Sequence, residues 1–216
     1  PVVKEAASWF LGGVFLNYNS SYLERALEQM LDEADSPEVT RFLRAVDVRI
    51  GGFRVEKAPE GRGQRVFVRH DVDGRGYELR LPEESAGTQK LMGLAAFLLA
   101  ALERGSTVIV DELDAKLHPK LLRYVILLFK DPEVNKHGAQ LIFSSQDVST
   151  MRNDVFRRDE IWFAARGEGE ASQLWSLADI HEANGNLVSK NAAFDKQYLS
   201  GRYGADPYLT RIEEWD

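Results

Sequence analysis

The sequence has no cysteine and no long uninterrupted apolar run. Without cysteine the chain has no disulfide, no thiolate-bound zinc and no thiol nucleophile. Its best candidate for a membrane span, Leu91–Leu102, has about half of the roughly 20 residues that a membrane helix needs. The first residues show no signal-peptide pattern. We therefore expect a cytoplasmic protein that does not contact a membrane.

An excess of positive charge is also absent. The 216 residues include 27 Lys and Arg against 34 Asp and Glu, which gives a formal net charge of −7. This balance argues against a module that coats nucleic acid, and it leaves a local basic patch open. With 44% hydrophobic and 28% charged residues, the composition is typical of a globular domain, and the length allows a sizeable core.

The first part of the chain changes its hydrophobic pattern near residue 48. Residues 1–47 are predicted to be helical, because a capping box at Ser21–Glu24 and a helix start at Ser36-Pro37 each precede apolar residues at helical spacing. Residues 48–82 alternate with a period of two and predict an antiparallel hairpin arm, with a turn at Asp73-Gly74. The strands of this arm are expected at Arg49–Lys57, Arg65–His70 and Gly76–Leu81.

Residues 83–216 alternate between helix and strand. A helix that is apolar on nearly all sides is predicted at Thr88–Glu103 and is therefore expected to be buried. A second helix is predicted at Pro119–Phe129, and strands at Thr107–Val110, Leu141–Phe143, Ile161–Ala165 and Gln173–Leu177. This alternation favours an α/β fold with a mostly parallel sheet and helices on its faces.

Two adjacent carboxylates, Asp111 and Glu112, follow the apolar strand Val108-Ile109-Val110. In α/β folds ligands bind at the carboxyl ends of the strands. A carboxylate pair there suits a hard cation such as Mg²⁺, with the second acid free to orient or deprotonate a water. The alternative is that the two acids merely end a strand and begin a loop.

Small residues and hydroxyls open the buried helix, in the segment Glu84-Ser85-Ala86-Gly87-Thr88-Gln89. At such a helix start the backbone N–H groups can approach an anion closely, and the helix dipole favours negative charge. The alternative is that Ser85 is an ordinary N-cap that needs no ligand.

The order of these motifs resembles the second half of an ABC-type ATPase head. More narrowly, the Glu-Ser-x-Gly-Thr spelling, the run Asp111-Glu112-Leu113-Asp114 with His118-Pro119 after it, and the tail Gly201–Ala205 resemble one group. These are the AAA-type ATP-binding proteins of bacterial abortive-infection and anti-phage systems, relatives of the old-lysogenisation-defect (OLD) and chromosome-maintenance (SMC) ATPases. The resemblance covers roughly residues 48 to 209, and residues 1–47 fit the end of the family's helical insertion.

The resemblance implies an ATPase that uses ATP and Mg²⁺. Two heads would form a homodimer or higher oligomer around ATP, and the dimer would gate an associated effector, a nuclease or toxin. The implied roles are the signature motif for Ser85, Ala86, Gly87 and Thr88, which binds nucleotide in trans; Mg²⁺ binding for Asp111; the general base for Glu112; the D-loop aspartate for Asp114; and the γ-phosphate sensor for Gln146.

The sequence departs from the family pattern in two places. No Gly-x-x-x-x-Gly-Lys-[Ser/Thr] loop occurs in these residues, although in the family this P-loop precedes all the motifs above. Since the chain also begins at Pro1, we expect the C-terminal half of a head that is inactive alone, with the P-loop half on the same or a separate chain. The switch histidine of the family is replaced by Gln146, which cannot take up a proton and so argues against fast hydrolysis.

Two other functions stay open. A Mg²⁺-dependent nuclease would use Asp111, Glu112 and Asp114 to bind two ions, with Asp147 as a further acid. A degenerate head would serve as a dimerisation or docking module without hydrolysis, which the substitution at Gln146 favours. The sequence leaves the binding of nucleic acid open.

Overall fold

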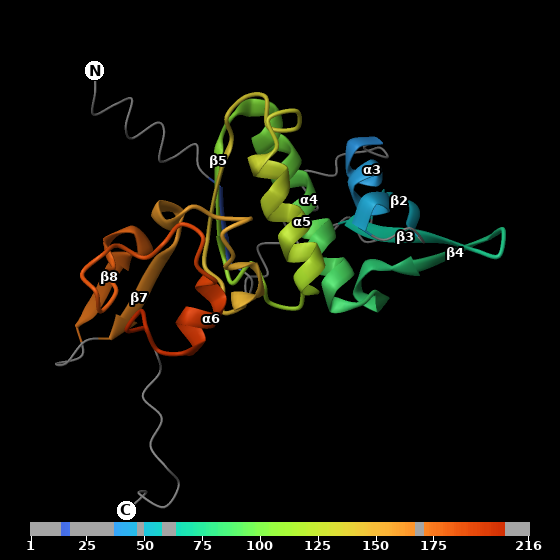
Figure 1. Ribbon diagram of the computed structural model, residues 1–216. Helices are drawn as coiled ribbons and strands as arrows, with labels where there is room; N and C mark the ends of the chain where they lie inside the picture. Colours follow the sequence, from blue (N-terminus) through green and yellow to red (C-terminus); the bar gives the residue numbers. More distant parts are fainter. Residues whose placement is uncertain (1–13, 18–36, 47–49, 58–63, 167–170, 206–216) are drawn as a thin grey trace, which may run out of the picture. The chain divides into compact units, whose positions relative to one another are not determined.

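The structure, a computed structural model, describes residues 14–17, 37–46, 50–57, 64–166 and 171–205 (Figure 1). The chain divides into two compact units between Gln146 and Asp147. The helix predicted to begin at Ser21 lies outside the described residues.

A three-stranded parallel sheet forms the centre of the first unit. Its strands are β1 (Val14–Asn17), β5 (Thr107–Asp111) and β6 (Gln140–Phe143), in the order β1-β5-β6. β5 pairs in parallel with both neighbours, and its Val108 and Val110 are buried. Because the three strands run in the same direction, their carboxyl ends lie at one edge of the sheet.

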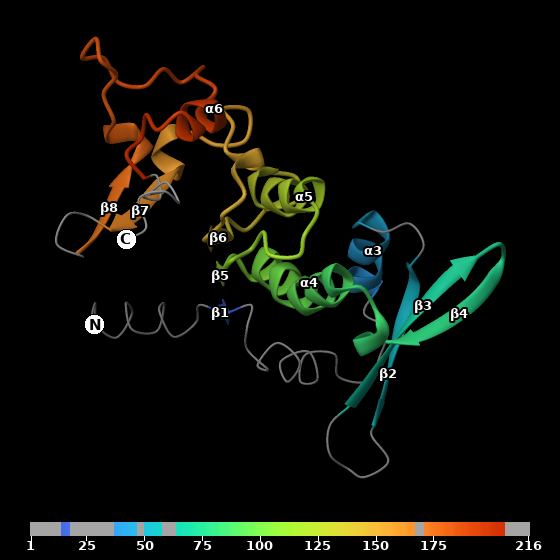
Figure 2. The ribbon, with the colours of Figure 1, turned by 90° about the horizontal axis from the view of Figure 1, so that it is seen from below.

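Helices α4 (Ala86–Arg104) and α5 (Pro119–Lys130) lie on the same side of this sheet (Figure 2). α4 is buried continuously from Lys90 to Leu98, which confirms the predicted burial, and Gly105 ends the helix with a left-handed φ of 67°. α5 joins β5 to β6 and completes a strand–helix–strand unit, so the predicted mixed α/β fold is confirmed. No helix in the described ranges is both long enough and apolar enough to cross a membrane.

The predicted arm is a three-stranded antiparallel sheet. Its strands β2 (Ile50–Lys57), β3 (Gln64–Val72) and β4 (Arg75–Arg80) pair in the order β2-β3-β4. Asp73 and Gly74 both have positive φ and form the tight turn between β3 and β4, as the sequence predicts. β4 is exposed along its whole length, and the β3–β4 hairpin extends away from the helices (Figure 2).

The arm is attached to the start of α4. Helix α3 (Pro37–Val46) contacts both β2 and α4 and buries Val39, Phe42 and Leu43. From the middle strand of the arm, Nε2 of His70 lies 2.6 Å from Oε1 of Glu84. Glu84 directly precedes the N-cap of α4, so the arm and the helix start form one continuous packed region.

The second unit is built around an aromatic cluster. It contains strands β7 (Trp162–Arg166) and β8 (Ser172–Ser176) and the short helix α6 (Phe194–Leu199). Phe163 stacks on Tyr198 with ring centroids 5.6 Å apart, and its ring centroid lies 5.3 Å from that of Tyr203. Three single-turn helices complete the unit: η2 (Val148–Thr150), η3 (Arg158–Glu160) and η4 (Leu177–Asp179).

The prediction that β7 and β8 belong to the parallel layer was wrong. The two strands pair with each other in antiparallel orientation, in a sheet of their own. Only residues 167–171 connect them, and two neighbouring parallel strands need a crossover of roughly a dozen residues or more. Among the described residues, the parallel sheet therefore has three strands and the other two sheets are antiparallel.

Candidate active site

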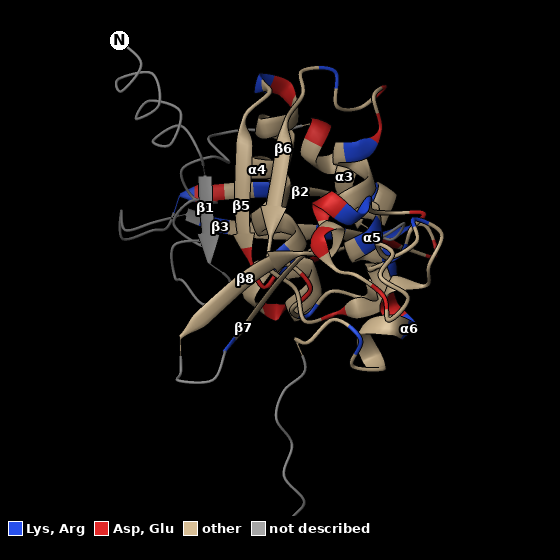
Figure 3. Ribbon diagram, turned by 60° about the vertical axis from the view of Figure 1, so that its left-hand side comes forward, with Lys and Arg blue, Asp and Glu red and all other residues tan. Residues whose placement is uncertain are grey.

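Asp111 and Glu112 lie at the carboxyl end of the central strand β5, and both are exposed. Figure 3 shows acidic residues in red where the β5 arrow ends. The neighbouring strand β6 ends at the same edge and continues into Ser144, Ser145 and Gln146. The structure therefore brings the Asp-Glu pair and the predicted switch segment together.

Ser144 connects the ends of β5 and β6. The Ser144 hydroxyl donates a hydrogen bond to Oδ1 of Asp111 at 2.5 Å. The Ser144 hydroxyl oxygen also accepts the N–H of Glu112 at 2.8 Å. The Ser144 backbone adds two bonds, from its N–H to the carbonyl of Val110 and from the N–H of Leu113 to its own carbonyl. Both acids are thus fixed from the neighbouring strand. Sequence analysis did not select Ser144, although its position directly after an apolar strand is a usable signal.

The loop after the acids is tightly folded. Glu112 has a φ of 50° and Lys116 a φ of 62°, in the left-handed region that residues other than glycine rarely adopt. The N–H of Ala115 bonds to the carbonyl of Glu112 at 3.1 Å. Leu113, which is fully buried, anchors the loop in the core. Strained backbone of this kind persists where the surrounding structure holds it, and it is common at functional sites.

Asp114 belongs to this loop and joins it to Gln146, in the segment that follows β6. Its Oδ2 accepts the backbone N–H of Gln146 at 3.2 Å. Its Oδ1 is buried and has no hydrogen-bond partner in the part of the chain that the structure describes. A buried carboxylate oxygen without a donor is costly. A further hydrogen-bond donor beside Oδ1 of Asp114 would therefore stabilise the site.

The segment Ser85–Thr88 forms the first turn of α4. The Ser85 hydroxyl accepts the N–H of Thr88 at 3.1 Å, so Ser85 is the N-cap of α4, as the alternative interpretation of this segment expected. The same hydroxyl lies 2.9 Å from that of Thr88. A Cβ atom at Gly87 would lie 3.0 Å from the carbonyl oxygen of Lys116. The helix start therefore packs directly against the loop that follows the two acids, and only glycine allows this approach without displacement.

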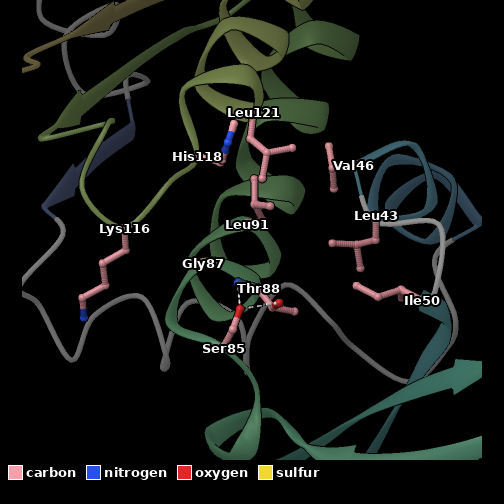
Figure 4. Close-up of a pocket in the computed structure, with 10 residues that line it drawn as sticks. All are labelled: Leu43, Val46, Ile50, Ser85, Gly87, Thr88, Leu91, Lys116, His118 and Leu121. Atoms are coloured by element: carbon pink, nitrogen blue, oxygen red, sulfur yellow. Dashed lines mark hydrogen bonds between the residues drawn. The ribbon is translucent and has the colours of Figure 1, made fainter. Parts of the chain in front are cut away.

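A pocket of about 360 Å³ opens beside this helix start (Figure 4). One side is polar and the other is apolar. The polar lining comes from Ser85, Thr88, Lys116 and His118, and the apolar lining from Leu43, Val46, Ile50, Leu91 and Leu121. His118 also has a structural role, because its Nδ1 accepts the N–H of Lys120 and caps α5.

Lys90 is a further residue that the sequence analysis did not select. It lies on α4 with only 4% of its surface exposed, and its ammonium group donates to the carbonyls of Glu112 at 2.6 Å and Ala115 at 2.9 Å. Burial lowers the pKa of Lys90 to about 8, against the opposing effect of the Asp114 and Glu112 carboxylates. The only available signal was a lysine inside an otherwise apolar helix.

The acids of the site are suited to share a cation with phosphate oxygens. Mg²⁺ is commonly held by one or two carboxylates together with substrate phosphates and water, which the exposed Asp111 fits. Within the described ranges, no three His, Asp or Glu side chains gather into a group that could hold a metal ion.

A parallel sheet whose central strand ends in an Asp-Glu pair, with helices packed on it, is consistent with an AAA-like α/β fold. Residues 7–152, more than half of the chain, match the protein family described as "AAA domain, putative AbiEii toxin, Type IV TA system". The chain therefore belongs to this family of AAA domains, which confirms the resemblance to ATPases of abortive-infection systems. A comparison with curated proteins found no match.

Proposed function

We propose that this chain is part of a head that dimerises around ATP and Mg²⁺ and hydrolyses the ATP. It would supply the signature helix start Ser85–Thr88, the acidic pair Asp111 and Glu112 (the Walker B motif) and the switch residue Gln146. The P-loop, absent from these 216 residues, would come from a segment or chain outside them. Closing and opening of the dimer would gate a defence effector, a nuclease or toxin. Membership in a family of toxin–antitoxin AAA domains supports an effector of this kind.

Each site residue has one role in this proposal. The helix start Ser85–Thr88 contacts the γ-phosphate held by the partner head, where its free N–H groups and hydroxyls face negative charge. Asp111 holds the metal ion, which neutralises charge on the phosphates. Asp114 connects the two sites across the dimer, and Gln146 contacts the γ-phosphate.

Glu112 is the proposed general base. It takes a proton from the attacking water as the water oxygen bonds to the γ-phosphorus and the bond to the β–γ bridging oxygen breaks, which releases ADP and phosphate. Because glutamine cannot accept a proton, Gln146 contacts the γ-phosphate without taking part in the proton transfer. We therefore expect turnover to be slow.

One observation supports this proposal above the others: a Cβ atom at Gly87 of the helix start would lie only 3.0 Å from the Lys116 carbonyl oxygen, in the loop that follows Glu112. The anion-binding helix start and the acids are thus parts of one packed region. In the proposed dimer the helix start acts on the partner's ATP and the acids act on the ATP of their own head, so this contact couples the two ATP sites. A nuclease that uses only the acids has no need of it.

The test compares three preparations with ATP and Mg²⁺. The 216-residue chain alone is expected neither to bind ATP tightly nor to hydrolyse it. The protein joined to the P-loop half encoded upstream of Pro1, in the same or a neighbouring reading frame, is expected to do both. In that complete protein Glu112→Gln should slow hydrolysis at least about 100-fold and trap an ATP-bound dimer in size-exclusion chromatography.

The matched control is Glu103→Gln, which makes the same chemical change at the exposed far end of α4. It should hydrolyse ATP at the parental rate. Parental turnover in Glu112→Gln would refute the general-base role. ATP-dependent dimers without turnover in the wild type would identify a degenerate module, and cleavage of plasmid DNA with Mg²⁺ alone would identify a nuclease.

A further inference from the structure

Lys90 is the only lysine or arginine among the buried residues that the structure describes. Lysine is almost never fully buried unless its ammonium group is satisfied by partners. An apolar residue would fit the buried surface of α4 without this cost. The contacts of the Lys90 ammonium group should therefore explain why a lysine occupies this position.

The ammonium group of Lys90 reaches across to the loop behind the acids. It donates to the carbonyl of Glu112 at 2.6 Å and to that of Ala115 at 2.9 Å. These bonds are charge-assisted and stronger than bonds between neutral groups. They join α4 to both ends of the short turn that carries Asp114.

The Glu112 residue is held on both sides by these contacts. Its N–H bonds to the Ser144 hydroxyl at 2.8 Å, and its carbonyl accepts from Lys90. Between these bonds its φ is 50°, which is unfavourable for a residue with a Cβ. The strained backbone fixes the direction of the Glu112 side chain, and Lys90 is the part of α4 that maintains it.

Lys90 lies on the same helix as the signature motif, about one and a half turns beyond Ser85. We propose that Lys90 is a positioning residue that links the signature helix to Glu112, so that a shift of the helix start on a partner's phosphate is transmitted to the residue that acts on water. This inference rests on the proposed function. Lys90 itself touches neither ATP nor the water.

The experiment uses the complete protein and the variant Lys90→Met, which keeps the length and apolar stem of the side chain but has no donor. We expect kcat for ATP hydrolysis to fall about 30-fold, since small misplacements of catalytic groups cost rates of this order. The KM for ATP should stay within about threefold, and ATP-dependent dimers should still form. Hydrogen exchange at the amides of Ala115 and Leu117 should become faster, with or without ATP.

Lys136→Met, at an exposed lysine in the loop before β6, is the matched control and should behave like the wild type. Wild-type kcat or unchanged exchange in Lys90→Met would overturn the proposal, as would a parallel loss of ATP-dependent dimers. If Lys90→Met does not fold, Lys90→Gln replaces it, because its shorter amide side chain reaches only one of the two carbonyls. Turnover and amide exchange between those of the wild type and those expected for Lys90→Met would support the link. Wild-type values of both would overturn it. If the wild-type complete protein does not hydrolyse ATP, the proposed function fails. The comparison of amide exchange between wild type and Lys90→Met then still tests whether Lys90 links α4 to the loop.

Discussion

The Ser144 hydroxyl donates to Oδ1 of Asp111 at 2.5 Å and so joins the ends of two parallel strands. A hydroxyl has one proton and two lone pairs. Because the proton points to Asp111, a lone pair is left to accept the N–H of Glu112 at 2.8 Å. One side chain therefore orients the carboxylate of the first acid and the backbone of the second.

Ser144→Ala should disturb both acids at once. The N–H of Glu112 loses its partner, so we expect about 1 kcal/mol lower unfolding free energy and ATP turnover in the complete protein lower by about 10- to 100-fold. Ser144→Thr keeps the hydroxyl and should retain most of the activity. Equal rates in the alanine and threonine variants, measured by phosphate release, would show that the hydroxyl does not position the acids.

Gly87→Ala should separate function from stability. The new Cβ would lie 3.0 Å from the Lys116 carbonyl, so the helix start must shift by a few tenths of an ångström. Alanine favours the helix over glycine by up to about 1 kcal/mol, which offsets the strain. We expect the thermal midpoint to change by only about 4 °C or less, while ATP-dependent dimerisation of the complete protein weakens about tenfold.

Gly76→Ala is the control for that variant, because the nearest atoms to its Cβ belong to the flexible guanidinium of Arg69. It should dimerise like the wild type. Normal dimerisation of Gly87→Ala, measured by light scattering with ATP, would mean that the close contact between helix start and loop is not needed for pairing.

The elements around the site could be predicted because their signals are local. The apolar run predicted α4, which begins at Ala86, two residues before the expected Thr88, and apolar residues ahead of Asp111 predicted β5. Strand β1 was not predicted, and it falls within the segment 1–47 assigned to helix. Its four residues form a strand through pairing with β5, a contact between distant parts of the chain that no local pattern encodes.

The same reason explains what was missed in the site. The bonds of Lys90 reach carbonyls 22 and 25 residues further along the chain, so they exist only once α4 and the loop are packed together. Backbone acceptors also carry no sequence signature. The positive φ of Glu112 is likewise a product of packing, since glutamate has no preference for that region.

Gly105 and Gly138, two of the glycines with left-handed φ, provide a stability test. Their φ values are 67° and 70°, so alanine should cost roughly 1 to 2 kcal/mol at either position. At Gly105 the Cβ would also lie 2.3 Å from the carbonyl oxygen of His137, whereas at Gly138 no atom lies within 4 Å. We therefore expect Gly105→Ala to cost at least about 2 kcal/mol more. Equal shifts of the urea midpoint would contradict this packing of the α4 end.

The lowered pKa of Lys90 predicts how stability depends on pH. Burial brings this pKa from 10.5 to about 8 in the folded chain. Between these values the unfolded chain keeps the proton that the folded chain has released, so the contribution of Lys90 to stability rises as pH increases from about 8 to 10.5. Below pH 8 both states are protonated, and the contribution is constant.

Comparison with Lys90→Met isolates this effect from the other titrating groups. The unfolding free energy of the wild type minus that of the variant should increase above pH 8 by at most about 1.4 kcal/mol per pH unit. The Asp114 and Glu112 carboxylates are the charged groups that oppose the shift of the Lys90 pKa. Urea denaturation at pH 7, 8, 9 and 10 measures the difference. A difference that is flat or falls with pH would mean that the Lys90 ammonium is not held in a desolvated position between α4 and the loop.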